Sequence, residues 1–114
     1  MPDEMLESLY ADSLTAAGTR LISSDCIERL LDYAKTRVSV AVILETYRLE
    51  NGLEVPCIEL GITYPQYQSI TSGHSNNEKI NTMSRVVKDY LSDARRTSGE
   101  YAFAIWFEDI GNGI

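Results

Sequence analysis

Histidine, cysteine and proline are scarce in this chain, and their scarcity argues against several kinds of site. One histidine and two cysteines occur in 114 residues, and their positions follow no zinc-binding spacing. The acidic residues lack the D-x-D-x-D-G order of a calcium loop, and the glycines form neither a dinucleotide-binding motif nor a Walker loop. We therefore expect no metal site, no cofactor and no catalytic residue, and interpret the chain as a protein that is not an enzyme.

His74 is the one histidine and the natural choice for a general base near neutral pH. It follows a glycine in a polar segment, whereas the conceivable nucleophile, Cys57, lies within an apolar, strand-like run. A catalytic triad needs its groups in contact, and nothing in the spacing brings these two together. An exposed loop histidine is the simpler interpretation.

No stretch of the sequence is typical of a membrane span or a secretory signal. The longest strongly apolar run, residues 38–44, is far too short to cross a bilayer. The first five residues include neither a basic region nor an apolar one. Cys26 and Cys57 each stand beside apolar neighbours, which is typical of buried, reduced thiols. We expect a cytoplasmic protein that does not bind membranes.

Basic residues are the minority, and the net charge indicates the kind of partner. The chain has 17 acidic and 10 basic side chains, for a net charge of −7. Such a charge repels the phosphate backbone of nucleic acids and the anionic surface of membranes. The composition therefore disfavours direct nucleic-acid binding and favours a basic protein partner.

We interpret residues 1–114 as one domain. Three segments of it show the periodicity of helices. Apolar residues recur at three- and four-residue spacing over residues 1–18 and again from Asp25. A third helix opens at a capping box formed by Ser75 and Glu78.

A β-hairpin is predicted over residues 38–64. A β-branched run leads to Asn51-Gly52, the strongest short-range hairpin signal, and an apolar run follows it. Pro56 cannot donate to a ladder, which places the second strand at a sheet edge. With a two-residue turn, paired positions sum to 103, so that Ile43 faces Leu60. One face of the hairpin would then carry Ala41, Ile43, Tyr47, Ile58, Leu60 and Ile62.

The predicted class is α/β of the α+β kind, in the order α-α-β-β-α-β. A last strand follows the third helix and leads to a flexible tail over residues 108–114, and a long polar loop occupies residues 65–77. We expect a small three-stranded sheet, mixed or antiparallel, with helices packed mainly on one face. The last strand runs parallel to the second or inserts beside the first. A sheet this small leaves edges through which a homodimer could form.

Two features suggest surfaces for contact with a partner. Tyrosine offers a stiff contact area with a polar tip, and Tyr64 and Tyr67 bracket the start of the polar loop, where we expect both to be exposed. Acidic side chains gather on the first helix and at the hairpin tip. The predicted partner-binding residues are Tyr64, Tyr67, His74, Glu4, Glu7, Glu50 and Glu54.

The leading hypothesis for function is an acidic inhibitor that neutralises a basic, nucleic-acid-processing protein, of the immunity-protein or phage-inhibitor type. A dimeric, acidic chaperone or adaptor for a partner protein is the first alternative. A small enzyme or ligand-binding domain that uses residues 65–77 is the second.

Overall fold

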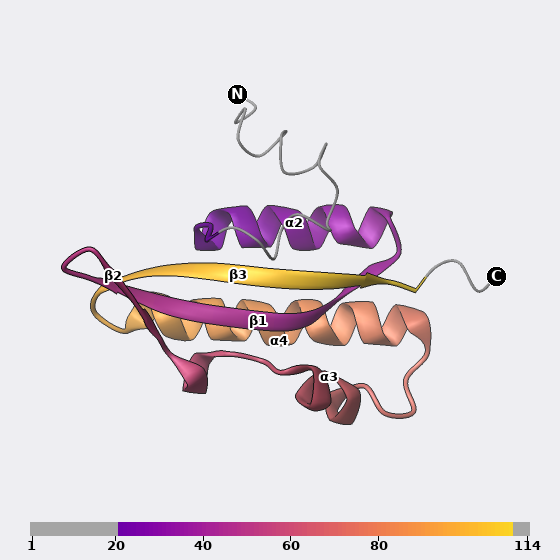
Figure 1. Cartoon of the computed structure of the whole chain (residues 1–114). Helices are drawn as coiled ribbons and strands as arrows, with labels where there is room; N and C mark the ends of the chain where they lie inside the picture. Colours follow the sequence, from indigo (N-terminus) through magenta and orange to yellow (C-terminus); the bar gives the residue numbers. More distant parts are fainter. Residues whose placement is uncertain (1–20, 111–114) are drawn as a thin grey trace.

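The computed structural model of this chain describes residues 21–110. The expected helix over residues 1–18, with Glu4 and Glu7, lies outside the described residues. The elements follow in the order α2 (Ser24–Thr36), β1 (Ser39–Glu50), β2 (Leu53–Pro56), the 3-10 turn η2 (Ile58–Leu60), α3 (Tyr64–Ile70), α4 (Asn76–Arg96) and β3 (Glu100–Asp109) (Figure 1). The α+β class is confirmed, and the order of the described elements is α-β-β-α-α-β.

Within residues 21–110 the sheet has three strands in the order β2-β1-β3, and both pairings are antiparallel. Of the two alternatives for the last strand, the structure shows insertion beside the first. The edge position that Pro56 predicted for the second strand is confirmed. The hairpin tip is also confirmed, because Asn51 and Gly52 have φ of 51° and 79°. At the outer edge of β3, Ile22 forms one bridge with Phe103 through two backbone hydrogen bonds of 2.8 Å.

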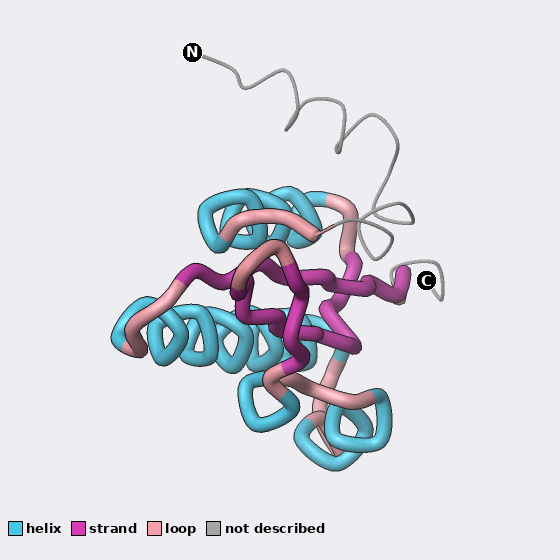
Figure 2. The backbone as a smooth tube through the Cα atoms, turned by 60° about the vertical axis from the view of Figure 1, so that its left-hand side comes forward, coloured by secondary structure: helices cyan, strands magenta, loops and turns pink. Residues whose placement is uncertain are grey.

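Helices α2 and α4 lie side by side on one face of the sheet (Figure 2). Arg95 near the end of α4 pairs with Glu28 at 2.9 Å and with Asp25 at 3.3 Å, and Lys88 pairs with Asp32 at 3.7 Å. In Figure 1, β1 passes in front of α4, so the opposite face of the sheet is turned toward the viewer. None of the helices within residues 21–110 has the length and apolarity needed to cross a membrane.

The hydrophobic core fills the space between these helices and the sheet. Alternate strand residues point to opposite faces, and the pairs Leu44–Ile105 and Thr46–Phe103 are buried on the helix side. Met83 of α4 is fully buried against them in the same cluster. The helical periodicity that begins at Asp25 is confirmed, because the apolar residues of α2 that it spaces, Ile27, Leu30, Leu31 and Ala34, are all buried.

The second strand is shorter than predicted, and the predicted register holds only near the turn. Paired positions sum to 103 from Glu50–Leu53 to Tyr47–Pro56, after which β2 ends. Pairing resumes at Leu44–Ile62, where the sum is 106, so three extra residues form η2. The expected pairing of Ile43 with Leu60 is therefore wrong.

Local hydrogen bonds explain this detour. The Cys57 amide donates to the carbonyl of Thr46 at 2.8 Å, and the Cys57 carbonyl then accepts from the amide of Leu60 at 3.1 Å. The Thr46 hydroxyl donates to the Leu60 carbonyl at 2.6 Å, which holds the turn against β1. The predicted common face is wrong as well, because Ile62 is buried while Ile58 is 85% exposed.

The predicted loop over residues 65–77 is mostly helical. Thr63 caps α3 by accepting from the Gln66 amide at 3.3 Å, and the Gln66 side chain accepts from the Thr63 amide at 2.7 Å. Pro65 suits the first turn of a helix because its missing amide is not needed there. The prediction relied on the polarity of the segment and missed this capping box, so that only residues 71–75 connect α3 to α4.

The predicted start of α4 agrees with the structure, whereas the predicted end of β3 does not. The capping box of Ser75 and Glu78 is confirmed, with bonds of 3.3 Å and 2.8 Å. The tail predicted from residue 108 is wrong for its first residues, because Glu108 and Asp109 extend β3. The Ile110 amide still donates to the Val38 carbonyl at 3.1 Å.

Candidate functional site

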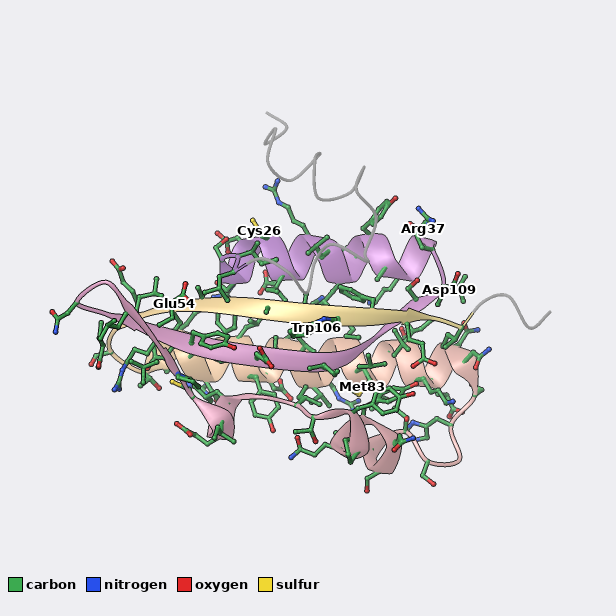
Figure 3. The ribbon with its side chains drawn as sticks, in the orientation of Figure 1. Cys26, Arg37, Glu54, Met83, Trp106 and Asp109 are labelled. Carbon is green, nitrogen blue, oxygen red and sulfur yellow. The ribbon has the colours of Figure 1, made fainter. Side chains whose placement is uncertain are left out.

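The sheet face opposite α2 and α4, which we call the open face, is the candidate site. Its centre consists of the cross-strand pairs Ile43–Trp106, Glu45–Ala104 and Tyr47–Ala102, by their register with the buried pairs. Figure 3 labels Trp106 near the middle of the sheet and Glu54 beside the hairpin. The side chains that share this face are Ile43, Glu45, Tyr47, Leu49, Glu54, Pro56, Glu100, Ala102, Ala104, Trp106 and Glu108.

Charge on the described residues is divided between the two layers. Helices α2 and α4, with the cap residue Arg37, carry eight basic and six acidic side chains. The three strands and η2 carry seven acidic side chains and one basic one. That basic residue, Arg48, pairs in register with Tyr101 on the helix side of the sheet and contacts Glu50 at 2.6 Å. The strand side chains of the open face therefore bring four carboxylates and no cation.

An apolar groove runs along the open face beside β1. It has a volume of about 350 Å³ and is lined by residues 43–47 of β1 and by residues 56–58 and 61–64 of the returning chain. The groove exists because η2 carries the chain away from β1 where a regular second strand would have continued. Ile58 lies at this point with 85% of its surface exposed, a large apolar side chain without cover in the described structure.

Gly61 permits the close approach that forms one side of the groove. A Cβ atom at this position would lie 2.9 Å from the carbonyl oxygen of Leu44. The next residue, Ile62, exchanges two backbone hydrogen bonds with Leu44, of 2.9 Å and 3.0 Å. A side chain at position 61 would therefore push the returning chain away from β1.

Two tyrosines of this region are hydrogen-bonded to carboxylates. The hydroxyl of Tyr47 donates to Glu45 at 2.6 Å, and this bond is the main reason why the pKa of Tyr47 is raised. The hydroxyl of Tyr64 donates to Glu108 at 3.0 Å, which likewise raises the pKa of Tyr64. Because Ile62 and β3 flank opposite edges of β1, the Tyr64 side chain spans β1 to reach Glu108. These bonds hold both rings in place on the face.

The predicted tyrosines differ in exposure. Tyr64 is 37% exposed, as expected, but Tyr67 is only 5% exposed, so its expected exposure is wrong. The two rings lie 5.4 Å apart, but Tyr67 is the buried residue of α3 and belongs to the hydrophobic core cluster. Burial is also the main reason why the pKa of Tyr67 is raised.

The other predicted residues are not all brought together. Glu54 lies on the open face near Tyr47, whose pKa its charge helps to raise. Glu50 is in ion-pair contact with Arg48 at the hairpin. His74 is half-buried and lines a separate hollow of about 290 Å³ with Tyr67 and others, and its buried Nδ1 has no hydrogen-bond partner within the described residues.

The groups that a catalytic site would need are dispersed. Cys57 lines the groove, His74 lines the other hollow, and Glu59 lines neither. Neither Cys26 nor Cys57 is in a disulfide. Within residues 21–110, no three histidine, cysteine or acidic side chains are placed to hold a metal ion.

Sequence reasoning missed Glu45, Ile58, Trp106 and Glu108. A single carboxylate inside an otherwise apolar strand was a usable signal for Glu45, because it indicates a face that meets water. The alternation of small and large residues in β3 pointed toward Trp106. Nothing local marked Ile58, since its exposure follows from the three-residue detour. Comparisons with protein-family models, curated proteins and solved structures find no significant match to this chain.

Proposed function

We propose that this protein is a binding inhibitor that covers a basic surface of a nucleic-acid-processing protein with its open face. The observation that supports the proposal is the composition of that face. Within the described part of the chain, its strand side chains include four carboxylates and no cation, and they surround an apolar centre with Trp106 and Tyr47. Proteins that handle nucleic acids present cations to phosphates, and this face carries the complementary charge.

The apolar centre supplies what charge alone does not. Aromatic side chains dominate the energetics of many interfaces, while charges at the rim set the encounter rate and the choice of partner. Tyr47 and Tyr64 are held by bonds to Glu45 and Glu108, so that little side-chain entropy remains to be lost on binding. The face therefore combines ordered aromatic groups with a single sign of charge.

The same charge argues against pairing of two open faces with each other, because like charges would meet across a two-fold axis. A homodimer through a sheet edge stays a prediction, and of the described edges β2 is short and β3 is already bridged by Ile22.

Capture from a lysate of the native host, with matched charge-reversal variants, tests the proposal. The face variant is Glu54→Lys with Glu100→Lys, two exposed open-face residues. The control is Asp32→Lys with Asp89→Lys on the helical layer, which changes the net charge equally. We expect the wild type and the control to retain the same basic protein. The face variant should bind that protein at least about tenfold more weakly, which is a loss of about 1.4 kcal/mol in binding free energy.

The captured protein must then lose nucleic-acid binding or processing when the wild-type chain is added. Equal retention by both variants would exclude the open face as the binding surface. Retention of many unfolded proteins, with no effect on any one activity, would favour the chaperone alternative.

A further inference from the structure

We infer that the groove beside β1 receives one aromatic or aliphatic side chain of the partner, next to a lysine or arginine in the same segment. The groove would thus recognise a partner segment in which an apolar side chain stands next to a cation. It rests on the proposed function only in taking a protein as the source of that side chain.

The dimensions and lining of the groove support an apolar occupant. Its volume of about 350 Å³ lies at the lower end of the range of roughly 300–1,000 Å³ that ligand pockets occupy. Ile43 forms part of one wall, and Cys57 and Ile58 form part of the other. Ile58 is 85% exposed in the free chain, so an inserted side chain would remove apolar surface of the groove from water.

The polar groups at the groove select the charge of the neighbouring residue. Glu45 lines the groove with Tyr47, whose hydroxyl already donates to one of its carboxylate oxygens. Among residues 21–110, no lysine or arginine lines the groove. An apolar side chain next to a cation therefore meets both a matching cavity and a carboxylate, whereas an acidic neighbour would meet only repulsion.

A protein segment fits these features better than a small apolar ligand does. The groove lies on the same face as Glu54, Glu100 and Glu108. A segment anchored in the groove can place further cations near these carboxylates, which a single small apolar molecule cannot.

Capped tripeptides titrated into the full-length protein test the inference by NMR. Lys-Trp-Lys carries both required groups, Glu-Trp-Glu reverses the charge, and Lys-Gly-Lys removes the anchor. We expect Lys-Trp-Lys to shift the backbone resonances of Ile43, Ile58 and Gly61, and each of the other peptides to bind about tenfold more weakly.

Two variants and one control assign the binding to the groove. Ile58→Ser should weaken Lys-Trp-Lys without affecting folding, because the side chain is exposed. Glu45→Gln keeps an acceptor for Tyr47 and should remove the preference for Lys-Trp-Lys over Glu-Trp-Glu. The control variant, Asp89→Asn on α4, should change neither the affinity for Lys-Trp-Lys nor the preference for it over Glu-Trp-Glu. Equal binding of the three peptides, or shifts confined to other surfaces, would overturn the inference.

The two proposals fail separately. If the lysate yields no face-dependent partner but Lys-Trp-Lys still binds in the groove, the proposed function fails and the groove keeps its specificity. If a face-dependent partner is found and the peptide does not bind in the groove, only the present inference fails.

Discussion

Gly61→Ala is expected to destabilise the protein although alanine can adopt the backbone conformation of this residue. Gly61 has φ of −125° and ψ of 169°, an extended conformation open to any residue. In such a position the replacement of glycine by alanine normally stabilises by about 0.4–1 kcal/mol, because the unfolded chain loses freedom. At position 61 we expect the change in stability to have the opposite sign, because the new methyl group would contact β1.

The magnitude follows from the contact between the new Cβ and the Leu44 carbonyl. The Cβ would lie 2.9 Å from that oxygen, and ordinary contact begins near 3.4 Å, so the two chains must separate locally. The movement lengthens the two hydrogen bonds between Leu44 and Ile62, now 2.9 Å and 3.0 Å. Each such bond contributes about 0.5–1.5 kcal/mol net. After subtraction of the unfolded-state gain, we expect a loss of about 1–2 kcal/mol.

Urea unfolding measures this loss, and amide hydrogen exchange locates it. The midpoint should fall without a change in slope, and the amides of Leu44 and Ile62 should exchange faster relative to amides of the core. A variant with unchanged or increased stability and with unchanged exchange at these amides would refute the reasoning. The groove would then not depend on the close approach of Gly61.

Three further predictions concern a helix cap, a tyrosine and the core. The backbone amide of Ser75 donates to Glu78 and holds the pKa of that carboxyl below 4.5, so its stabilising effect is present above the unfolded-state pKa and is lost as the pH falls through the folded-state pKa. Urea unfolding from neutral to acidic pH should therefore show a shrinking difference between the wild type and Glu78→Gln, and a constant difference would contradict this. The bond to Glu108 raises the pKa of Tyr64 above 10.0, so an absorbance titration of Tyr64→Phe should lose a phenol from the late part of the curve, not from its early part. Met83 is fully buried, and Met83→Ala should cost about 2–5 kcal/mol in urea unfolding; a loss below about 1 kcal/mol would contradict its place in the core.

Several elements were predictable because local chemistry decides them. The Asn51-Gly52 turn and the capping box at Ser75 depend on residues adjacent in sequence. The buried stripe of α2 follows from helical periodicity. For the same reason the box that begins at Thr63 was available in the sequence, and the polarity of the residues after it concealed α3.

The candidate site was predictable only in part. Tyr64 and Glu54 were named from the sequence, and both lie on or beside the open face. Tyr67 was expected beside them and is buried, because the side on which a tyrosine lies depends on how a helix is rotated against the core. Glu108 was missed because its partner Tyr64 lies far away in the sequence, whereas the signal for Glu45, a carboxylate within an apolar run, was present and was not used.

The amino-acid sequence by itself determined the class of fold, the hairpin tip, the helix that follows Ser75 and the excess of acidic charge, since each depends on composition or on residues close in the chain. Only the tertiary structure decided that β3 inserts beside β1 and that four of the acidic side chains on the strands, those of Glu45, Glu54, Glu100 and Glu108, face away from the helices. It also decided the groove, because the three-residue detour after Pro56 depends on hydrogen bonds between Cys57, Thr46 and Leu60. The bonds to Thr46 join β1 to residues that follow β2, and no local pattern reports their register.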